Sequence, residues 1–257
     1  MSILRLLGVS WWLQLKARSR SAFDGALTLI YPIFFTTTIF MMYEQGNASS
    51  SALVATAVGA SAMSIWSAVS TTAATAMQSE RRFGTLELLV LAPRPLALLL
   101  VPVIMSMATI GVYSMIVTLL WARFVFSIDI QIADPAAFVA AVIVMVVSIA
   151  MLGVVLATAS VRYRGAWALG STLEMPVWLI CGFLVAVADL PTWVRPLSWA
   201  LAPTWGMAAI QAAADGRPAW LYMLVCAALA AVYGLVGAVL TRRVVHAARV
   251  HATLGLT

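Results

Sequence analysis

Long apolar runs without charged residues, separated by short polar segments, constrain this sequence more than any other feature. A hydrocarbon core about 30 Å thick requires roughly 20 apolar residues to cross it as a helix. Backbone polar groups inside lipid must be paired within the protein, so each run is expected to be helical. The weak alternation that marks an outer-membrane barrel strand is absent from the sequence. We therefore predict an all-α integral membrane protein with six transmembrane helices, over residues 25–43, 52–78, 96–122, 135–160, 165–188 and 219–241.

The basic residues predict the orientation of these helices, because Lys and Arg accumulate in cytoplasmic loops. With both termini in the cytoplasm, three of the fifteen basic residues fall outside, namely Arg123, Arg195 and Arg217, and the other twelve fall inside. Charged residues make up only 9% of the chain, against roughly a quarter in an average soluble domain. We therefore attribute the net charge of +6 to the basic residues that orient the helices in the membrane, and not to a nucleic-acid-binding surface.

We interpret residues 1–257 as a single membrane domain with specialised segments at its surfaces. Residues 1–22 predict an amphipathic helix in the inner interface, with an ordinary basic tail as the alternative. The apolar side chains that share one face of this helix are Leu4, Leu7, Trp11 and Leu15.

The segment of residues 189–218 is too apolar for a solvated loop and too rich in proline to span the membrane. Short re-entrant helices in the outer leaflet would pair the backbone polar groups of this segment, provided that protein buries the helix ends. The alternative is that its tryptophans only form an aromatic belt at the headgroups. Asp134 followed by Pro135 predicts a capped start for the fourth span.

The sequence also excludes several kinds of chemistry. Lys16 is the only lysine, and no glycine-rich turn precedes it, so the chain has no phosphate-binding P-loop. No His lies in a predicted span, and no cluster of His, Cys and carboxylates offers metal-ligand spacing. Cys181 and Cys226 are expected to be buried thiols. We predict that the chain is not an enzyme and binds no cofactor itself.

Glu174 is an ionisable residue inside the fifth predicted span, just before Pro176. Carboxylates inside the membrane are costly and are usually functional. Glu174 could bind a cationic cargo, carry a proton, or join a hydrogen-bond network between helices. The alternative is a structural glutamate that faces the bundle.

The charged segment of residues 79–95 stands between the second and third predicted spans. Glu80 and Glu87 would share a face of a helix, because they are seven residues apart. Gly84 interrupts any continuous helix, and Thr85 is a suitable N-cap for a new one. Pro93 would end that short helix, which is long enough to touch something outside the membrane.

This segment resembles the cytoplasmic loop of ABC exporter permeases of the ABC-2 type. The matching residues are Glu80, Arg81, Arg82, Gly84, Thr85, Leu86, Glu87 and Pro93. The resemblance extends over nearly the whole chain, through the six spans, the N-terminal interface helix, and a Leu-Pro-x-Trp…Pro-x-x-Trp pattern before the last span.

The resemblance implies a permease subunit that pairs with a second permease, either a copy of itself or a related chain. Each permease would rest on a separate ATPase subunit that binds ATP and Mg, so that two ATPase copies serve the pair. Residues 85–92 would form a coupling helix seated in a groove of that ATPase. The transporter would export a hydrophobic or amphipathic compound, such as a drug, a lipid or a lipid-linked molecule, across a prokaryotic inner membrane.

Substrate would then pass between the paired bundles, along the second and fifth spans. The candidate pathway residues are Met63, Trp66, Glu174, Met175, Trp178 and Phe183, each of which could instead be a lipid or packing contact. The competing hypothesis is a proton-coupled secondary transporter that uses Glu174 as its carrier. It explains the carboxylate but leaves the charged segment of residues 79–95 without a role.

Overall fold

The computed structural model describes residues 3–19, 30, 33–34, 36–38, 40–41, 50–82, 97–160 and 166–251. These residues form helices and short connections, and no strand occurs in this part of the chain. The all-α class is therefore confirmed. The helices are α1 (Ile3–Ser19), α3 (Ser50–Arg82), α5 (Ala97–Val125), α6 (Pro135–Ser160), α7 (Ala166–Ile180), η1 (Val187–Asp189), α8 (Arg195–Trp199), α9 (Ala202–Ala214) and α10 (Trp220–His251).

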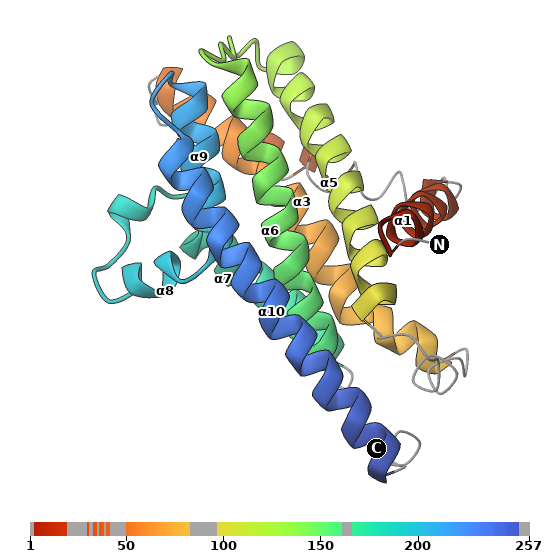
Figure 1. Cartoon of the computed structure of the whole chain (residues 1–257). Helices are drawn as coiled ribbons and strands as arrows, with labels where there is room; N and C mark the ends of the chain where they lie inside the picture. The colour runs from red at the N-terminus through yellow and green to blue at the C-terminus, as the bar shows by residue number, and fades with distance from the viewer. Residues whose placement is uncertain are drawn as a thin grey trace.

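Four long helices, α3, α5, α6 and α10, make up the body of the molecule (Figure 1). The C-terminal ends of α3, α6 and α10 lie at the lower end in that view, where α5 begins. The connection of residues 126–134 lies at the opposite end. Helix α7 packs mainly on α3, and α9 packs on α6 and α10. The bundle thus places α3 at the centre of the contacts between the long helices and α7.

Four helices among the described residues are long and apolar enough to cross a membrane. They cover Leu53–Thr75, Leu98–Val125, Pro135–Ser160 and Trp220–Val244. These stretches match the predicted spans over residues 52–78, 96–122, 135–160 and 219–241. The predicted span over residues 25–43 lies mostly outside the described residues.

Helix α7 ends earlier than the sequence predicted. It stops at Ile180, and the chain turns at Cys181 and Gly182 instead of remaining helical to residue 188. Gly182 has φ of +80°, a left-handed conformation that glycine adopts at little steric penalty and that ends many helices. The predicted fifth span over residues 165–188 is therefore too long as a helix at its C-terminal end.

Glycines let the helices approach one another closely. A Cβ atom on Gly59 of α3 would lie 1.9 Å from the carbonyl oxygen of Phe183, which follows α7. A Cβ on Gly111 of α5 would lie 2.6 Å from the Cα of Ile65 on α3. Small residues at such crossings are typical of helix packing in membranes, where close van der Waals contact replaces hydrophobic burial as the driving force.

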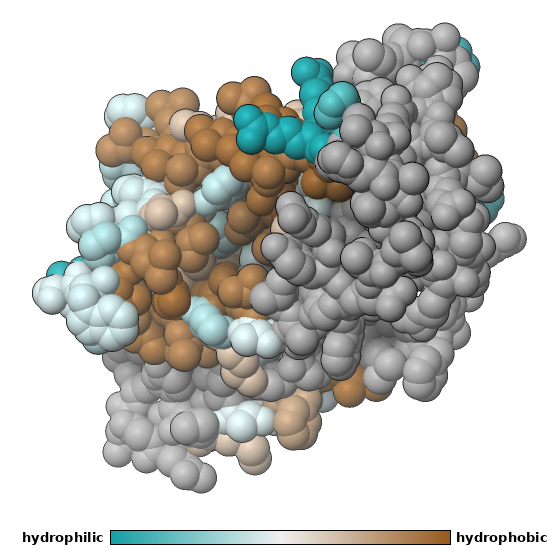
Figure 2. Space-filling view, turned by 90° about the horizontal axis from the view of Figure 1, so that it is seen from below, coloured by the Kyte–Doolittle hydropathy of each residue, from teal (hydrophilic) through white to brown (hydrophobic). Residues whose placement is uncertain are grey.

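The outer surface of the bundle is apolar over much of its area. In the view from below, apolar side chains cover much of the coloured surface and strongly hydrophilic ones are confined to small patches (Figure 2). Helix α10 is the extreme case, because only 17% of its apolar stretch is buried inside the protein. Leu235 on α10 is 68% exposed. Such a surface suits contact with lipid rather than with water.

The connection between α5 and α6 is held by polar contacts. The Asp134 carboxylate accepts a hydrogen bond from the backbone N–H of Ala137 at 3.0 Å, so the predicted cap of α6 is confirmed. The Asp129 carboxylate accepts from Gln131 at 2.6 Å and pairs with Arg123 at 3.0 Å. These contacts, that from Gln131 first, lower the pKa of the Asp129 carboxyl.

Helix α1 lies on the flank of the bundle against α5 (Figure 1). The indole N–H of Trp11 donates to the hydroxyl of Thr109 on α5 at 3.2 Å. Trp12 and Leu13, on the other side of α1, are exposed. A helix is therefore present within residues 1–22 as expected, and its place in the membrane interface stays a prediction.

Candidate functional site

Helices α3 and α7 meet in an antiparallel pair that carries a buried polar contact. Gly59, early in α3, lies against Phe183, just past the end of α7. Further along α3, the hydroxyl of Ser67 donates to a carboxylate oxygen of Glu174 on α7. Gly59 and Ser67 lie two helical turns apart, so a single edge of α3 follows α7. Met63 lies between them on that edge.

Glu174 is almost fully enclosed, with 8% of its surface exposed. Ser67 is its hydrogen-bond partner within the described part of the chain. The two ion pairs found among the described residues, Arg123 with Asp129 and Arg217 with Asp215, both lie elsewhere. A carboxylate in such surroundings is expensive unless it is neutralised or paired. Glu174 is therefore a buried carboxyl group whose hydrogen-bond partner, Ser67, is neutral.

Two buried indoles accompany this contact. Trp66 directly precedes Ser67 on α3, and Trp178 follows Glu174 by one turn of α7. They are 1% and 2% exposed, respectively. The indole N–H of Trp66 has no hydrogen-bond partner among the residues that the structure describes. Each helix of the contact thus carries a buried indole close in sequence to Ser67 or to Glu174.

The predicted pathway residues separate into two groups. Met63, Trp66, Trp178 and Phe183 belong to the same buried core, and Glu174 is enclosed near them. Met175 is 55% exposed and lies on a different side of α7. None of the buried residues opens onto the surface of this single chain, and their role in transport stays a prediction.

A polar edge leads away from Ser67 along α3. The Thr71 hydroxyl donates to the carbonyl of Ser67 at 2.8 Å, and the Thr75 hydroxyl donates to the carbonyl of Thr71 at 2.8 Å. Thr71 is exposed, as is Thr172 on α7. Pro176 lies inside α7 and has no N–H to donate to the carbonyl of Thr172. The exposed hydroxyl of Thr71 therefore continues the edge of α3 that carries Ser67, the partner of Glu174.

The predicted ATPase-coupling residues begin at the far end of the same helix. Glu80, Arg81 and Arg82 form the last turn of α3, which continues without interruption from the Ser67 level. The remaining members of this predicted set, Gly84, Thr85, Leu86 and Glu87, lie outside the described residues. Helix α3 thus joins the start of the charged segment to the contact with Glu174.

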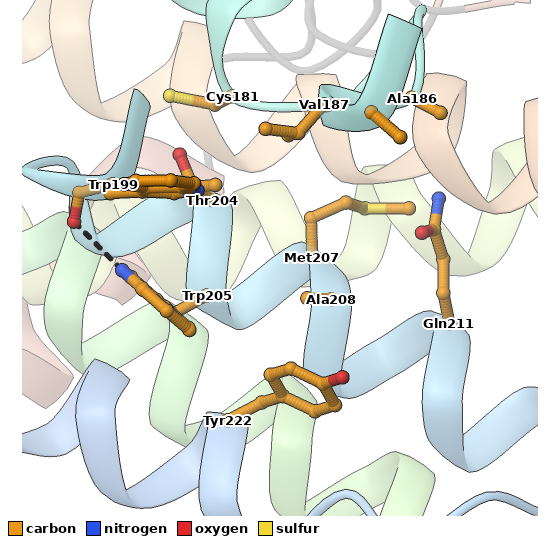
Figure 3. A pocket seen from close by; sticks show the side chains of 12 residues that line it. Cys181, Ala186, Val187, Trp199, Thr204, Trp205, Met207, Ala208, Gln211 and Tyr222 are labelled. Atoms are coloured by element: carbon orange, nitrogen blue, oxygen red, sulfur yellow. Dashed lines mark hydrogen bonds between the residues drawn. The ribbon is translucent and has the colours of Figure 1, made fainter. Parts of the chain in front are cut away.

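A cavity of about 280 Å³ lies beyond the end of α7 (Figure 3). Cys181 and Val187 border it on one side and Tyr222 on the other, with Gln211 at its edge. Within its wall, the indole N–H of Trp205 donates to the carbonyl of Trp199 at 2.8 Å. The sequence pointed to Trp199 and Trp205 through the density of Trp and Pro, but Gln211 and Tyr222 carried no comparable signal.

The segment that forms this wall is hydrogen-bonded to α10 and is also held together by bonds of its own. The Tyr233 hydroxyl of α10 donates to the carbonyl of Ala200, between α8 and α9, at 2.6 Å. The Arg195 guanidinium donates to the carbonyls of Ala188 and Leu190 at 2.7 and 3.0 Å. Short helices are thus present within residues 189–218, as predicted, and their depth in the membrane stays a prediction.

The family model described as ABC-2 type transporter matches residues 5–214, which include α1, the α3–α7 contact and the segment around the cavity. No curated protein matched the chain in sequence. Partnership with an ATPase is a general property of ABC transporters, to which this family contributes the membrane component. The chain belongs to the ABC-2 type transporter family and is a membrane-spanning permease component of an ABC transporter.

Proposed function

We propose that the chain is the permease subunit of an exporter that moves a hydrophobic or amphipathic compound across a prokaryotic inner membrane, with both termini in the cytoplasm. The observation that carries this proposal is the continuity of α3. One uninterrupted helix runs from Ser67, in contact with Glu174, to Arg82 at the start of the charged segment. A movement imposed at Arg82 would therefore reach the buried contact.

A continuous helix is suited to this task because its backbone hydrogen bonds hold its length fixed. The distance from Ser67 to Arg82 corresponds to roughly 22 Å at about 1.5 Å per residue. In the proposed arrangement, residues 85–92 sit in a groove of an ATPase subunit, and ATP-driven closure of two such subunits moves the ends of α3 in two paired permeases. ATP and Mg would be bound by the ATPase subunits.

The transport pathway would run between the paired permeases along α3 and α7. Thr71 and Met175 are exposed in the single chain and would face this pathway first. Trp66 and Phe183 are buried and would be reached only when α3 and α7 separate. The cavity beside Cys181 lies at the end of α7 and would receive the compound next.

The test is Glu87→Arg in the proposed coupling helix. ATP-dependent uptake into inverted membrane vesicles that contain both subunits should fall by about tenfold or more, because a reversed charge at an interface costs several kcal/mol. Expression and membrane insertion of the permease should be unchanged. Asp129→Arg, at the end of the molecule opposite to the last turn of α3, is the matched control and should transport normally. Uptake by Glu87→Arg at the rate of the unmodified protein would contradict the coupling role.

The enclosed carboxylate also supports a second candidate, a secondary transporter in which Glu174 carries a proton. Its test uses vesicles that contain the permease without any ATPase. Uptake driven by a pH gradient and abolished by Glu174→Gln would establish the secondary transporter. Uptake that occurs only with the ATPase and ATP would exclude it.

A further inference from the structure

The surroundings of Glu174 point to the chemistry of the cargo. We propose that Glu174 recognises a positively charged headgroup, so that the transporter prefers amphipathic cations over neutral compounds of the same shape. This inference rests on the proposed function and specifies the class of substrate for it. It is carried by the burial of Glu174, its contact with Ser67, and the groups that flank this contact.

The charge of Glu174 has no complement in the helices around it. The apolar stretches Leu53–Thr75 and Pro135–Ser160 contain no Lys or Arg, and Ser67 supplies a neutral donor. Among the described residues, no Lys or Arg therefore forms an ion pair with Glu174. A cation from the cargo would supply the missing charge, and its attraction to a carboxylate would be strong in a region of low polarity.

The neighbouring side chains suit the same headgroup. The buried indoles of Trp66 and Trp178 belong to one core cluster, and they come from the same two helices as Ser67 and Glu174. Aromatic faces attract weakly hydrated cations such as alkylated ammonium groups. The N–H of Trp66 has no partner within the described part of the chain and could donate to an oxygen beside the cationic centre. An apolar tail would find Met63 and Phe183 on the same side of α3.

The approach to Glu174 also favours a cation over an anion. Thr71 is exposed one helical turn beyond Ser67, the partner of the enclosed carboxylate. Its hydrogen is donated to the carbonyl of Ser67, so its oxygen is left to accept a hydrogen bond from an ammonium group.

The experiment compares two probes that differ only in charge, the trimethylammonium derivative of diphenylhexatriene and its tert-butyl isostere. Each is added to the permease–ATPase complex in lipid nanodiscs, and the concentration for half-maximal stimulation of ATP hydrolysis is measured. The unmodified complex should respond to the cationic probe at a lower concentration than to the neutral one. Glu174→Gln should raise the concentration needed for the cationic probe by about tenfold or more and leave the neutral probe unaffected.

Two controls make the result specific. Gln retains an oxygen that can accept from Ser67, so Glu174→Gln removes the charge while keeping the hydrogen bond. Asp215→Asn neutralises a carboxylate that is exposed and ion-paired with Arg217, and it should change neither response. An equal loss of both responses in Glu174→Gln, or an unchanged response to the cationic probe, would overturn the inference.

A second measurement separates this inference from the proposed function. The melting temperature of the permease alone is recorded with and without each probe. Stabilisation by the cationic probe that disappears in Glu174→Gln supports recognition even if the complex shows no ATP-dependent transport, in which case only the proposed function fails. Normal ATP-dependent transport without any charge preference overturns the inference alone.

Discussion

At the scale of single residues, a glycine that packs directly against a neighbouring backbone is sensitive to substitution, because there is no room for a side chain. Gly59 is such a position, because an added Cβ would meet the backbone oxygen of Phe183 at 1.9 Å. That oxygen belongs to the main chain and cannot rotate away as a flexible side chain would. Gly8 on α1 is the opposite case, with nothing within 4 Å of an added Cβ.

Gly59→Ala should therefore destabilise the protein by roughly 1–3 kcal/mol, as overpacking of a filled core does. Gly8→Ala should be neutral or slightly stabilising, because Ala has the better helix propensity by about 1 kcal/mol. Thermal unfolding of the purified proteins in detergent measures both. Equal melting temperatures for the two variants would show that α3 and the end of α7 are not packed as described.

Residue identity allowed some of the site to be predicted. The cost of a carboxylate inside a span marked Glu174, and the pattern of Asp before Pro marked the cap at Asp134, which is confirmed. The partner Ser67 could not be predicted, because α3 also carries Ser61, Ser64 and Ser70 at similar spacing. Which hydroxyl faces α7 depends on the rotation of α3, and that rotation is set by the close contacts at Gly59 and elsewhere.

At the scale of helices, the start of α6 offers a clean test of capping. Asp134→Ala removes the carboxylate that accepts from Ala137 and should cost about 1 kcal/mol, the usual value for a lost N-cap. Asp134→Asn keeps an acceptor of the same shape and should stay within a few tenths of a kcal/mol of the unmodified protein. Unfolding in a graded mixture of mild and denaturing detergents ranks the three proteins. Equal destabilisation by Ala and Asn would show that the charge, and not the cap, is what matters.

Helix ends were harder to predict than helix positions. The apolar run that contains α7 continues beyond Ile180, so hydrophobicity alone extends the helix to residue 188. The chain turns where Gly182 adopts a positive φ and where α3 approaches the backbone of Phe183. The hydrophobicity of the sequence reports neither the backbone conformation nor this contact. The coupling segment after Arg82 lies outside the described residues and stays a prediction.

At the scale of the whole molecule, the apolar exterior predicts where charge is tolerated. Leu235 lies in the middle of the most exposed helix, α10, and Leu235→Arg should reduce membrane insertion, with a penalty of about 2.5–3.5 kcal/mol near the bilayer centre. Trp193, between η1 and α8, is 81% exposed and would lie near the outer headgroups, so Trp193→Arg should insert normally. A glycosylation or alkali-extraction assay measures insertion. Normal insertion of Leu235→Arg would indicate that this face of α10 is not surrounded by lipid.

The overall class of the molecule could be predicted well, because clustered apolar runs leave few alternatives to helices that cross a bilayer. The packing order could not, since every long helix is apolar on most sides and periodicity does not distinguish neighbours. Contacts such as that between Trp11 and Thr109 depend on three-dimensional placement alone.

The early end of α7 has a consequence for the route by which a compound could leave. The 15 described residues of α7, Ala166–Ile180, amount to roughly 22 Å of helix, less than the thickness of about 30 Å of a hydrocarbon core. If α7 starts at the inner surface, as the distribution of Lys and Arg predicts, it stops among the acyl chains of the opposite monolayer. A molecule that follows α7 to its last turn and passes the cavity beside Cys181 would then be released sideways into the outer monolayer, and would reach water only by diffusing out of the bilayer afterwards.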